Sequence, residues 1–116
     1  MIQSQYIYDI IKLLLNSKEY EMLKNQAYYI KEENYEYTDS GVFISFEHEE
    51  NSLKYRTTDK HLRLGGILIK SDEIDIGAEA SLVINNGLID YLEIWSYAGL
   101  YPHRNLTNYI LEQPGK

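Results

Sequence analysis

The chain contains few residues whose type and spacing could support catalysis or metal binding. Its three histidines are His48, His61 and His103, and none stands in a recognised ligand motif with a second histidine or a carboxylate. Glu47 and Glu49 flank His48, but neighbouring side chains on a strand point to opposite faces. These carboxylates are therefore poorly placed to share a ligand with His48, and we expect no metal site there.

Other motifs for cation, phosphate or covalent chemistry are missing as well. The segment SDEID at 71–75 resembles half of a calcium loop, but it lacks the required glycine and terminal glutamate, so an acidic turn is expected. No phosphate-loop pattern follows Gly65–Gly66, and no serine lies in a nucleophile-elbow context. The absence of cysteine excludes disulfides and thiolate nucleophiles. We therefore expect a non-enzymatic protein without catalytic residues or cofactors.

The strongest apolar-aromatic strand carries two carboxylates, Asp90 and Glu93. Three positions separate them, so they face opposite sides of a sheet and cannot share one cleft as a catalytic pair. Glu93 instead shares its face with Tyr91, Trp95 and Tyr97. Such a face is either a ligand-binding surface or an aromatic ladder that stabilises cross-strand pairs.

The clearest charge feature is the segment 32–50. It holds seven Asp or Glu residues and no Lys or Arg, with tyrosines interleaved. One interpretation is a solvated hairpin, and the other is an acidic-aromatic patch that binds a basic protein. Under the second interpretation we predict that the partner contacts are Tyr35, Glu36, Tyr37, Glu47 and Glu49.

Length and composition narrow the class of protein. A chain of 116 residues fits one domain, 1–116, and its 44% hydrophobic content is enough for a core. The net charge of −7 argues against a nucleic-acid binder and against attraction to an anionic membrane. No segment looks like a signal peptide or a membrane span, so the expected compartment is the cytoplasm. The 12 tyrosines suit half-buried sheet faces and protein interfaces alike.

Helical periodicity is confined to the first part of the chain. Apolar residues between positions 7 and 15 recur at helical spacing, and Ser4 can cap the start of that helix. A second short helix is expected over 18–25, where it would bury Met22 and Leu23.

From residue 27 onward the pattern indicates strands. A hairpin is expected, with an interruption near Glu33–Asn34 and a turn in which Gly41 can take a positive φ. Residues 53–63 are expected to form a loop with a short strand, and Gly65–Gly66 a bulge or a closely packed strand entry. Asn86–Gly87 suits a type I′ turn. Further strands are expected near 67–69, 74–76, 80–84, 88–97 and 106–113.

These elements predict an α+β fold. One or two N-terminal helices should pack on one face of a mainly antiparallel, meander-like sheet of about six or seven strands. The other face of the sheet would then be left to water or to a partner.

The segment GAEASLVINNGLIDYLEIWSYAGLYP resembles a pattern in the small bacterial immunity proteins that accompany polymorphic toxins. The pattern is a strand, a turn with glycine, an L-E-I-aromatic-small-aromatic strand and a loop with proline. It is carried here by Gly87, Leu92, Glu93, Ile94, Trp95, Ser96, Tyr97 and Pro102, within a match over about 65–113. The resemblance implies a non-enzymatic cytoplasmic protein that binds and blocks a cognate toxin, often a nuclease. No catalytic or contact residue is carried over.

Two functional hypotheses follow from the sequence. The leading one is an immunity protein that neutralises a basic toxin domain by stoichiometric binding. The alternative is a small-ligand-binding domain, with an aromatic pocket between helix and sheet. That pocket would be lined by Tyr91, Glu93, Trp95 and Tyr97. The sequence leaves the oligomeric state open.

Overall fold

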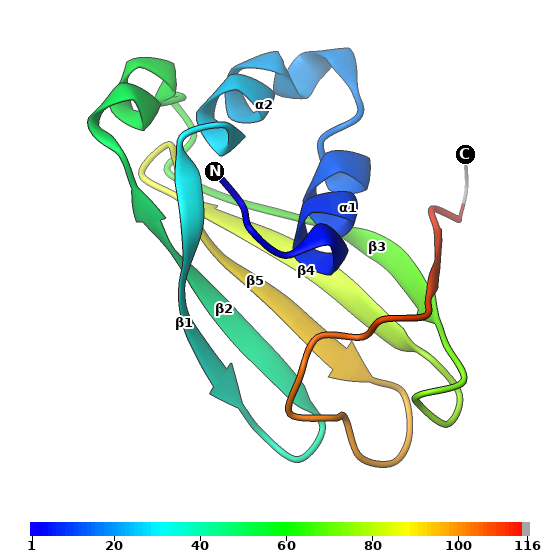
Figure 1. Cartoon of the computed structure of the whole chain (residues 1–116). Helices are drawn as coiled ribbons and strands as arrows, with labels where there is room; N and C mark the ends of the chain where they lie inside the picture. The colour runs from blue at the N-terminus through cyan, green and yellow to red at the C-terminus, as the bar shows by residue number, and fades with distance from the viewer. Residues whose placement is uncertain (115–116) are drawn as a thin grey trace.

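A six-stranded antiparallel sheet with helices over one of its faces makes up the fold (Figure 1). The computed structural model describes residues 1–114. Its helices are α1 (Gln5–Leu14) and α2 (Glu21–Ala27), with short 3-10 helices η1 (Lys18–Tyr20) and η2 (Glu50–Tyr55). Its strands are β1 (Ile30–Tyr37), β2 (Gly41–His48), β3 (His61–Lys70), β4 (Ala78–Asn85), β5 (Leu88–Ser96) and β6 (Ile110–Glu112). The predicted α+β class is confirmed.

The strands lie in the order β1-β2-β5-β4-β3-β6. β1 and β2 form one hairpin, and β3, β4 and β5 form a meander whose last strand pairs with β2. The sheet is therefore meander-like, as predicted, with one longer connection through η2. Asn86 and Gly87 join β4 to β5 with φ values of 54° and 77°, as the expected type I′ turn requires.

Helix α1 follows the predicted pattern. Ile7, Ile10 and Ile11 are buried against the sheet. The Ser4 hydroxyl accepts a hydrogen bond from the Ile7 N–H at 3.3 Å, which satisfies one of the free donors at the start of the helix. The apolar stripe and the cap thus both place α1 as expected.

Helix α2 differs from the prediction in which residues it buries. Leu23 is buried, but Met22 is 44% exposed, so the expected burial of Met22 is wrong. The physical reason is the entry of the helix: residues 18–20 form a 3-10 turn, and α2 begins only at Glu21. A 3-10 turn has three residues per turn, which changes the side of the segment that faces the sheet.

Strand β1 contains a bulge at Glu33, where the sequence predicted an interruption. The register of β1 against β2 shifts between Glu32 and Asn34. Because of this extra residue, Glu32 and Tyr35 both point toward the helix-covered face, whereas Asn34 points to the other face.

Gly41 does not have the positive φ that was predicted for it. It is the first residue of β2, opposite Trp95 of β5, and its φ is not in the left-handed region. A Cβ at this position would overlap the Ile94 carbonyl oxygen. Glycine is needed here because two backbones approach closely, not because of a turn.

After residue 60, the first strand is longer than predicted and the last strand is shorter. β3 is one strand with the expected bulge at Gly65–Gly66. The strand expected at 74–76 is a turn, because Glu73 there binds the backbone of Thr107 and Asn108 instead of a neighbouring strand. The last strand covers only Ile110–Glu112, and the rest of the expected 106–113 strand is irregular.

The hydrophobic core lies between the helices and the sheet. Leu92 and Ile94 of β5 and Ile44 of β2 are at most 1% exposed, and they pack in one cluster with the apolar face of α1. The segment after β5 closes this core, since Tyr101 and Leu106 are also buried in it. None of the helices within residues 1–114 is long and apolar enough to cross a membrane.

Candidate functional site

The face of the sheet opposite the helices is open. Side chains alternate along β5, so that Leu92 and Ile94 enter the core while Tyr91, Glu93 and Trp95 point to the opposite face. The sequence predicted that these last three residues share a face, and the structure places them together there.

Cross-strand pairing brings further aromatic and acidic residues beside them. Glu36 of β1 lies opposite Phe43 of β2, and Phe43 lies opposite Glu93 of β5. The rings of Phe43 and Tyr91 meet edge to face, with centroids 6.0 Å apart. Phe43 is 38% exposed, so this aromatic pair is available to a partner.

The pattern continues toward the other end of β5. Trp95 lies opposite Glu79 of β4. The hydroxyl of Tyr97 donates a hydrogen bond to the Glu79 carboxylate at 2.7 Å, and Tyr97 is 46% exposed. Partial burial and this carboxylate raise the pKa of Tyr97 to about 12, so the phenol keeps its proton at neutral pH.

A buried apolar residue lies beneath these side chains. Val83 points to the open face and stands outside the main core, yet it is only 1% exposed. Its strand neighbour Tyr91 lies directly opposite it. We refer to the surface built around Val83 as the aromatic–acidic face, and its members are Phe43, Tyr91, Trp95, Tyr97, Glu36, Glu79 and Glu93.

Glu93 has a structural partner in this face. Arg63 of β3 donates to the Glu93 carboxylate at 3.2 Å and to the Ser81 hydroxyl at 2.8 Å. In the hydrogen bonds of residues 1–114, His61 contacts Asn85 and His103 contacts the Thr38 carbonyl, so neither histidine meets Glu93. Glu93 therefore anchors Arg63 across the sheet, and no histidine stands beside it as an acid–base partner.

Two of the predicted partner contacts lie on the helix-covered side. Tyr35 and Tyr37 pack against the core, and burial raises the pKa of both phenols. The Tyr35 hydroxyl accepts a hydrogen bond from Asn105 at 3.2 Å, and the Tyr37 ring stacks on His103 with centroids 4.9 Å apart. Tyr35 and Tyr37 therefore hold the segment that contains His103 and Asn105 against β1.

The other three predicted contacts are divided between two places. Glu36 and Glu47 lie on the open face, where Glu47 pairs with Lys31 at 3.2 Å. Glu49 follows the end of β2 and lies 3.7 Å from the N-terminal amine. The five residues therefore do not form one surface, because strand alternation and the bulge in β1 send their side chains to opposite faces.

The predicted pocket between helix and sheet is wrong for the residues assigned to it. Tyr91, Glu93, Trp95 and Tyr97 lie on the face that the helices do not cover. A groove of about 560 Å³ does lie on the helical side, but it is formed by α1, α2 and the N-terminal segment.

Both ring nitrogens of His48 make hydrogen bonds within the fold. Its Nε2–H donates to the Ile89 carbonyl at 2.6 Å, and its Nδ1 lies 2.9 Å from the Ser52 hydroxyl. These contacts join the end of β2 to the start of β5 and to η2. Within the part of the chain that the structure describes, no group of three or more His, Asp or Glu side chains is placed to hold a metal ion.

Two members of the aromatic–acidic face, Phe43 and Glu79, and Val83 beneath it were not singled out from the sequence. Phe43 could have been found from alternation, since it stands between the inward-facing Val42 and Ile44. Val83 and Glu79 required the register of β4 against β5, which no local pattern specifies.

The chain was compared with family models, curated proteins and solved structures. No family model, no curated protein and no solved structure matches it. The case for a function therefore rests on the chain's own residues, above all on the aromatic–acidic face.

Proposed function

We propose that this protein is a non-enzymatic binding domain that uses the aromatic–acidic face to bind a basic protein partner. The observation that carries this proposal is the open sheet face itself. Aromatic side chains stand there beside carboxylates over a buried valine, without a covering helix. Aromatic residues supply the most binding energy at protein interfaces, and surrounding charges select the partner.

Net charge supports a basic partner. The chain carries −7, and the carboxylates of Glu36 and Glu79 remain on the open face beside the exposed Phe43 and Tyr97. An acidic surface attracts a basic one over about 10 Å at ordinary ionic strength, which speeds association.

The more specific form of the proposal is an immunity protein that neutralises a toxin domain. The resemblance to such proteins covers about residues 65–113, a segment that contributes Glu93, Trp95 and Tyr97 to the aromatic–acidic face. Nuclease toxins bind phosphates and are commonly basic, so an acidic inhibitor complements them.

The direct experiment uses a toxin domain encoded beside this gene. Binding to the wild-type chain is measured by calorimetry, and neutralisation by growth of cells that express the toxin. We expect Trp95→Ala to weaken binding by about 2 kcal/mol, roughly thirtyfold, as for a central aromatic contact. We expect Glu36→Lys with Glu79→Lys to slow association, and added salt to reduce this difference.

A matched charge reversal tests the location. Glu19→Lys with Glu50→Lys changes the net charge equally, but both residues are exposed on the short helices η1 and η2. This control should bind within about twofold of wild type. If the control slowed association as much as Glu36→Lys with Glu79→Lys, only the net charge of the chain would matter, and the proposed location would be wrong. Failure of the wild-type chain to bind any adjacent toxin domain would overturn the immunity function.

A further inference from the structure

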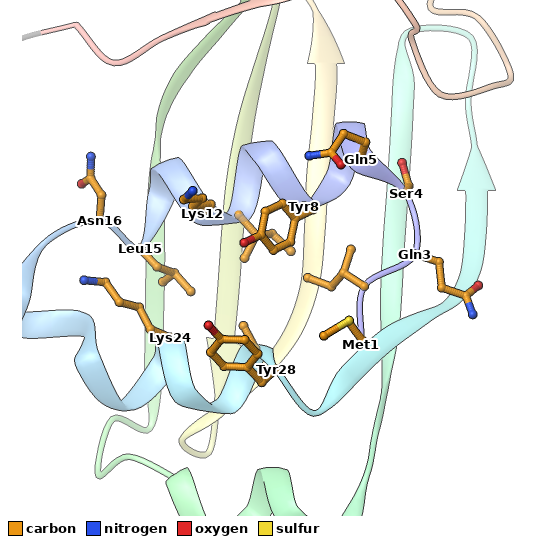
Figure 2. A pocket seen from close by; sticks show the side chains of 13 residues that line it. Met1, Gln3, Ser4, Gln5, Tyr8, Lys12, Leu15, Asn16, Lys24 and Tyr28 are labelled. Atoms are coloured by element: carbon orange, nitrogen blue, oxygen red, sulfur yellow. The ribbon is translucent and has the colours of Figure 1, made fainter.

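The groove on the helical side lies between α1 and α2. Figure 2 shows it from close by, with Tyr8 from α1 and Tyr28, just after α2, on opposite sides. Its volume of about 560 Å³ is within the range of small-molecule sites, roughly 300–1,000 Å³. The groove is on the other side of the sheet from the aromatic–acidic face.

Apolar side chains line most of the groove. Ile2, Ile11 and Leu15 are buried and contribute to its lining, and Ala27 leaves room because its side chain is small. Tyr8 and Tyr28 are 39% and 60% exposed, so their rings border the groove. An aliphatic chain in the groove would replace water on this apolar surface, at about 25 cal/mol per Å² buried.

Two lysines add positive charge to the lining of the groove. Lys12 and Lys24 lie near one end, beside Asn16 (Figure 2). None of the 13 lining residues is Asp or Glu, although the chain contains 18 of them. Lys12 lies over the Tyr8 ring at 5.9 Å, and Lys24 contacts Glu21, which is outside the lining, at 3.4 Å.

Both ends of the groove are bounded by the chain itself. At one end lies the connection that contains Asn16 and joins α1 to η1 (Figure 2). At the other end the N-terminal segment is held in place, because Glu32 accepts hydrogen bonds from the backbone N–H groups of Gln3 and Ser4, both at 2.8 Å. These bounds oppose a long partner helix, which is about 10 Å wide, and the groove volume of about 560 Å³ suits a small molecule.

We infer that the groove binds a small amphipathic carboxylate, with its aliphatic chain along Ile11, Leu15 and Ala27 and its carboxylate beside Lys12 and Lys24. Apolar burial supplies affinity, and the two ammonium groups select a negative head group. The inference does not depend on the proposed protein-binding function, because it concerns other residues on the other side of the sheet.

The test uses dodecanoate, below the concentration at which it forms micelles, with binding measured by calorimetry. The wild-type chain should bind one molecule saturably, and dodecyltrimethylammonium, with the same chain and opposite charge, should bind at least about tenfold more weakly. Lys12→Glu with Lys24→Glu should weaken dodecanoate binding at least about tenfold. The matched control, Lys31→Glu with Lys70→Glu, changes exposed lysines of β1 and β3 and should stay within about twofold.

A second variant tests the apolar part of the groove. Ala27→Leu fills the space beside α2 and should lower the affinity about tenfold while circular dichroism and the melting temperature stay close to wild type. The inference is overturned if dodecanoate does not bind, if the cationic amphiphile binds equally well, or if the control weakens binding as much as Lys12→Glu with Lys24→Glu. Binding of an acidic helical peptide instead of dodecanoate would assign the groove to a protein and would also overturn it.

Discussion

Two glycines in the sheet are needed for different physical reasons. Gly41 has an ordinary backbone conformation, but it lies directly against the Ile94 carbonyl of β5. Gly66 has a φ of 90°, and no atom lies within 4 Å of the position that a Cβ would occupy. The first glycine is required because two strands approach closely, and the second because its φ is in the left-handed region.

We predict that Gly41→Ala destabilises the protein more than Gly66→Ala. A methyl group at position 41 must push β2 and β5 apart, which should cost about 3 kcal/mol. At position 66 only backbone strain is expected, about 1–2 kcal/mol. Urea unfolding of both variants measures the difference, and an equal loss would contradict the assigned roles.

Glu73 joins the turn before β4 to the C-terminal segment. Its carboxylate accepts from the backbone N–H groups of Asn108 at 2.7 Å and Thr107 at 3.0 Å, and it pairs with Arg104. These donors hold the pKa of Glu73 at about 2, below its ordinary value of 4.5. The charged form is thus the one that the folded state stabilises.

The lowered pKa predicts how Glu73→Gln depends on pH. A depressed folded pKa contributes stability above about pH 4.5, and this contribution is lost as the pH falls toward 2. Glu73→Gln should therefore lower the urea midpoint at pH 7, and its difference from wild type should shrink between pH 4.5 and 2. Glu33→Gln, at the exposed bulge of β1, serves as the control and should match wild type throughout.

Helix α2 is attached to the sheet by one buried polar side chain. Gln26 is 0% exposed, and its amide donates to the carbonyls of Tyr55 and Gly87, both at 3.0 Å. The Ile89 N–H donates to the Gln26 carbonyl oxygen at 2.6 Å. A short helix that buries little apolar surface thus gains its position from hydrogen bonds to η2 and to the β4–β5 turn.

We predict that Gln26→Leu destabilises the protein strongly although it adds apolar surface. The change removes the Gln26 bonds to the Ile89 N–H and the Tyr55 carbonyl, at about 1–3 kcal/mol each, so a total loss on the order of 2–6 kcal/mol is expected. The Gly87 carbonyl keeps its hydrogen bond from the Thr57 N–H at 3.0 Å. Met22→Ala, on the exposed side of the same helix, should change the stability by less than about 0.5 kcal/mol. Chemical denaturation compares the two, and a neutral Gln26→Leu would contradict the attachment described.

The two ends of the chain are tied together around α1. The hydroxyls of Tyr6 and Tyr101 lie 2.7 Å apart in the core, and the Tyr109 hydroxyl donates to Asp9 of α1 at 2.8 Å. Burial raises the pKa of both core phenols, that of Tyr101 to about 12, so both are neutral near pH 7. The segment after β5 is therefore part of the core, and it leaves the opposite sheet face uncovered.

A double-mutant cycle tests the tie between the chain ends. Tyr6→Phe and Tyr101→Phe should each cost about 1–3 kcal/mol, because each leaves the other buried hydroxyl without its partner. The double variant should cost no more than either single change, since no unpaired hydroxyl remains. Additive losses in the free energy of unfolding would show that the two hydroxyls act independently.

Local patterns in the sequence were sufficient for much of the fold. The apolar stripe of α1, the Ser4 cap and the Asn86–Gly87 turn follow from helix spacing and backbone preference, which need no distant partner. Alternation along β5 likewise determined that Tyr91, Glu93 and Trp95 share a face. The α+β class followed from the order of these elements.

Tertiary structure decided which of the candidate residues meet. The bulge at Glu33 determines that Tyr35 takes the helix-covered face and Glu36 the open face, and the pairing of β1 with β2 and of β2 with β5 brings Glu36 and Phe43 to the face of Glu93. The contacts of Glu73 hold the segment 74–76 in a turn, where a strand was expected. The hydrogen bonds of Gln26 fix the position of α2 against the β4–β5 turn. Pairing register and long-range hydrogen bonds join residues far apart in the chain, so local periodicity does not contain them.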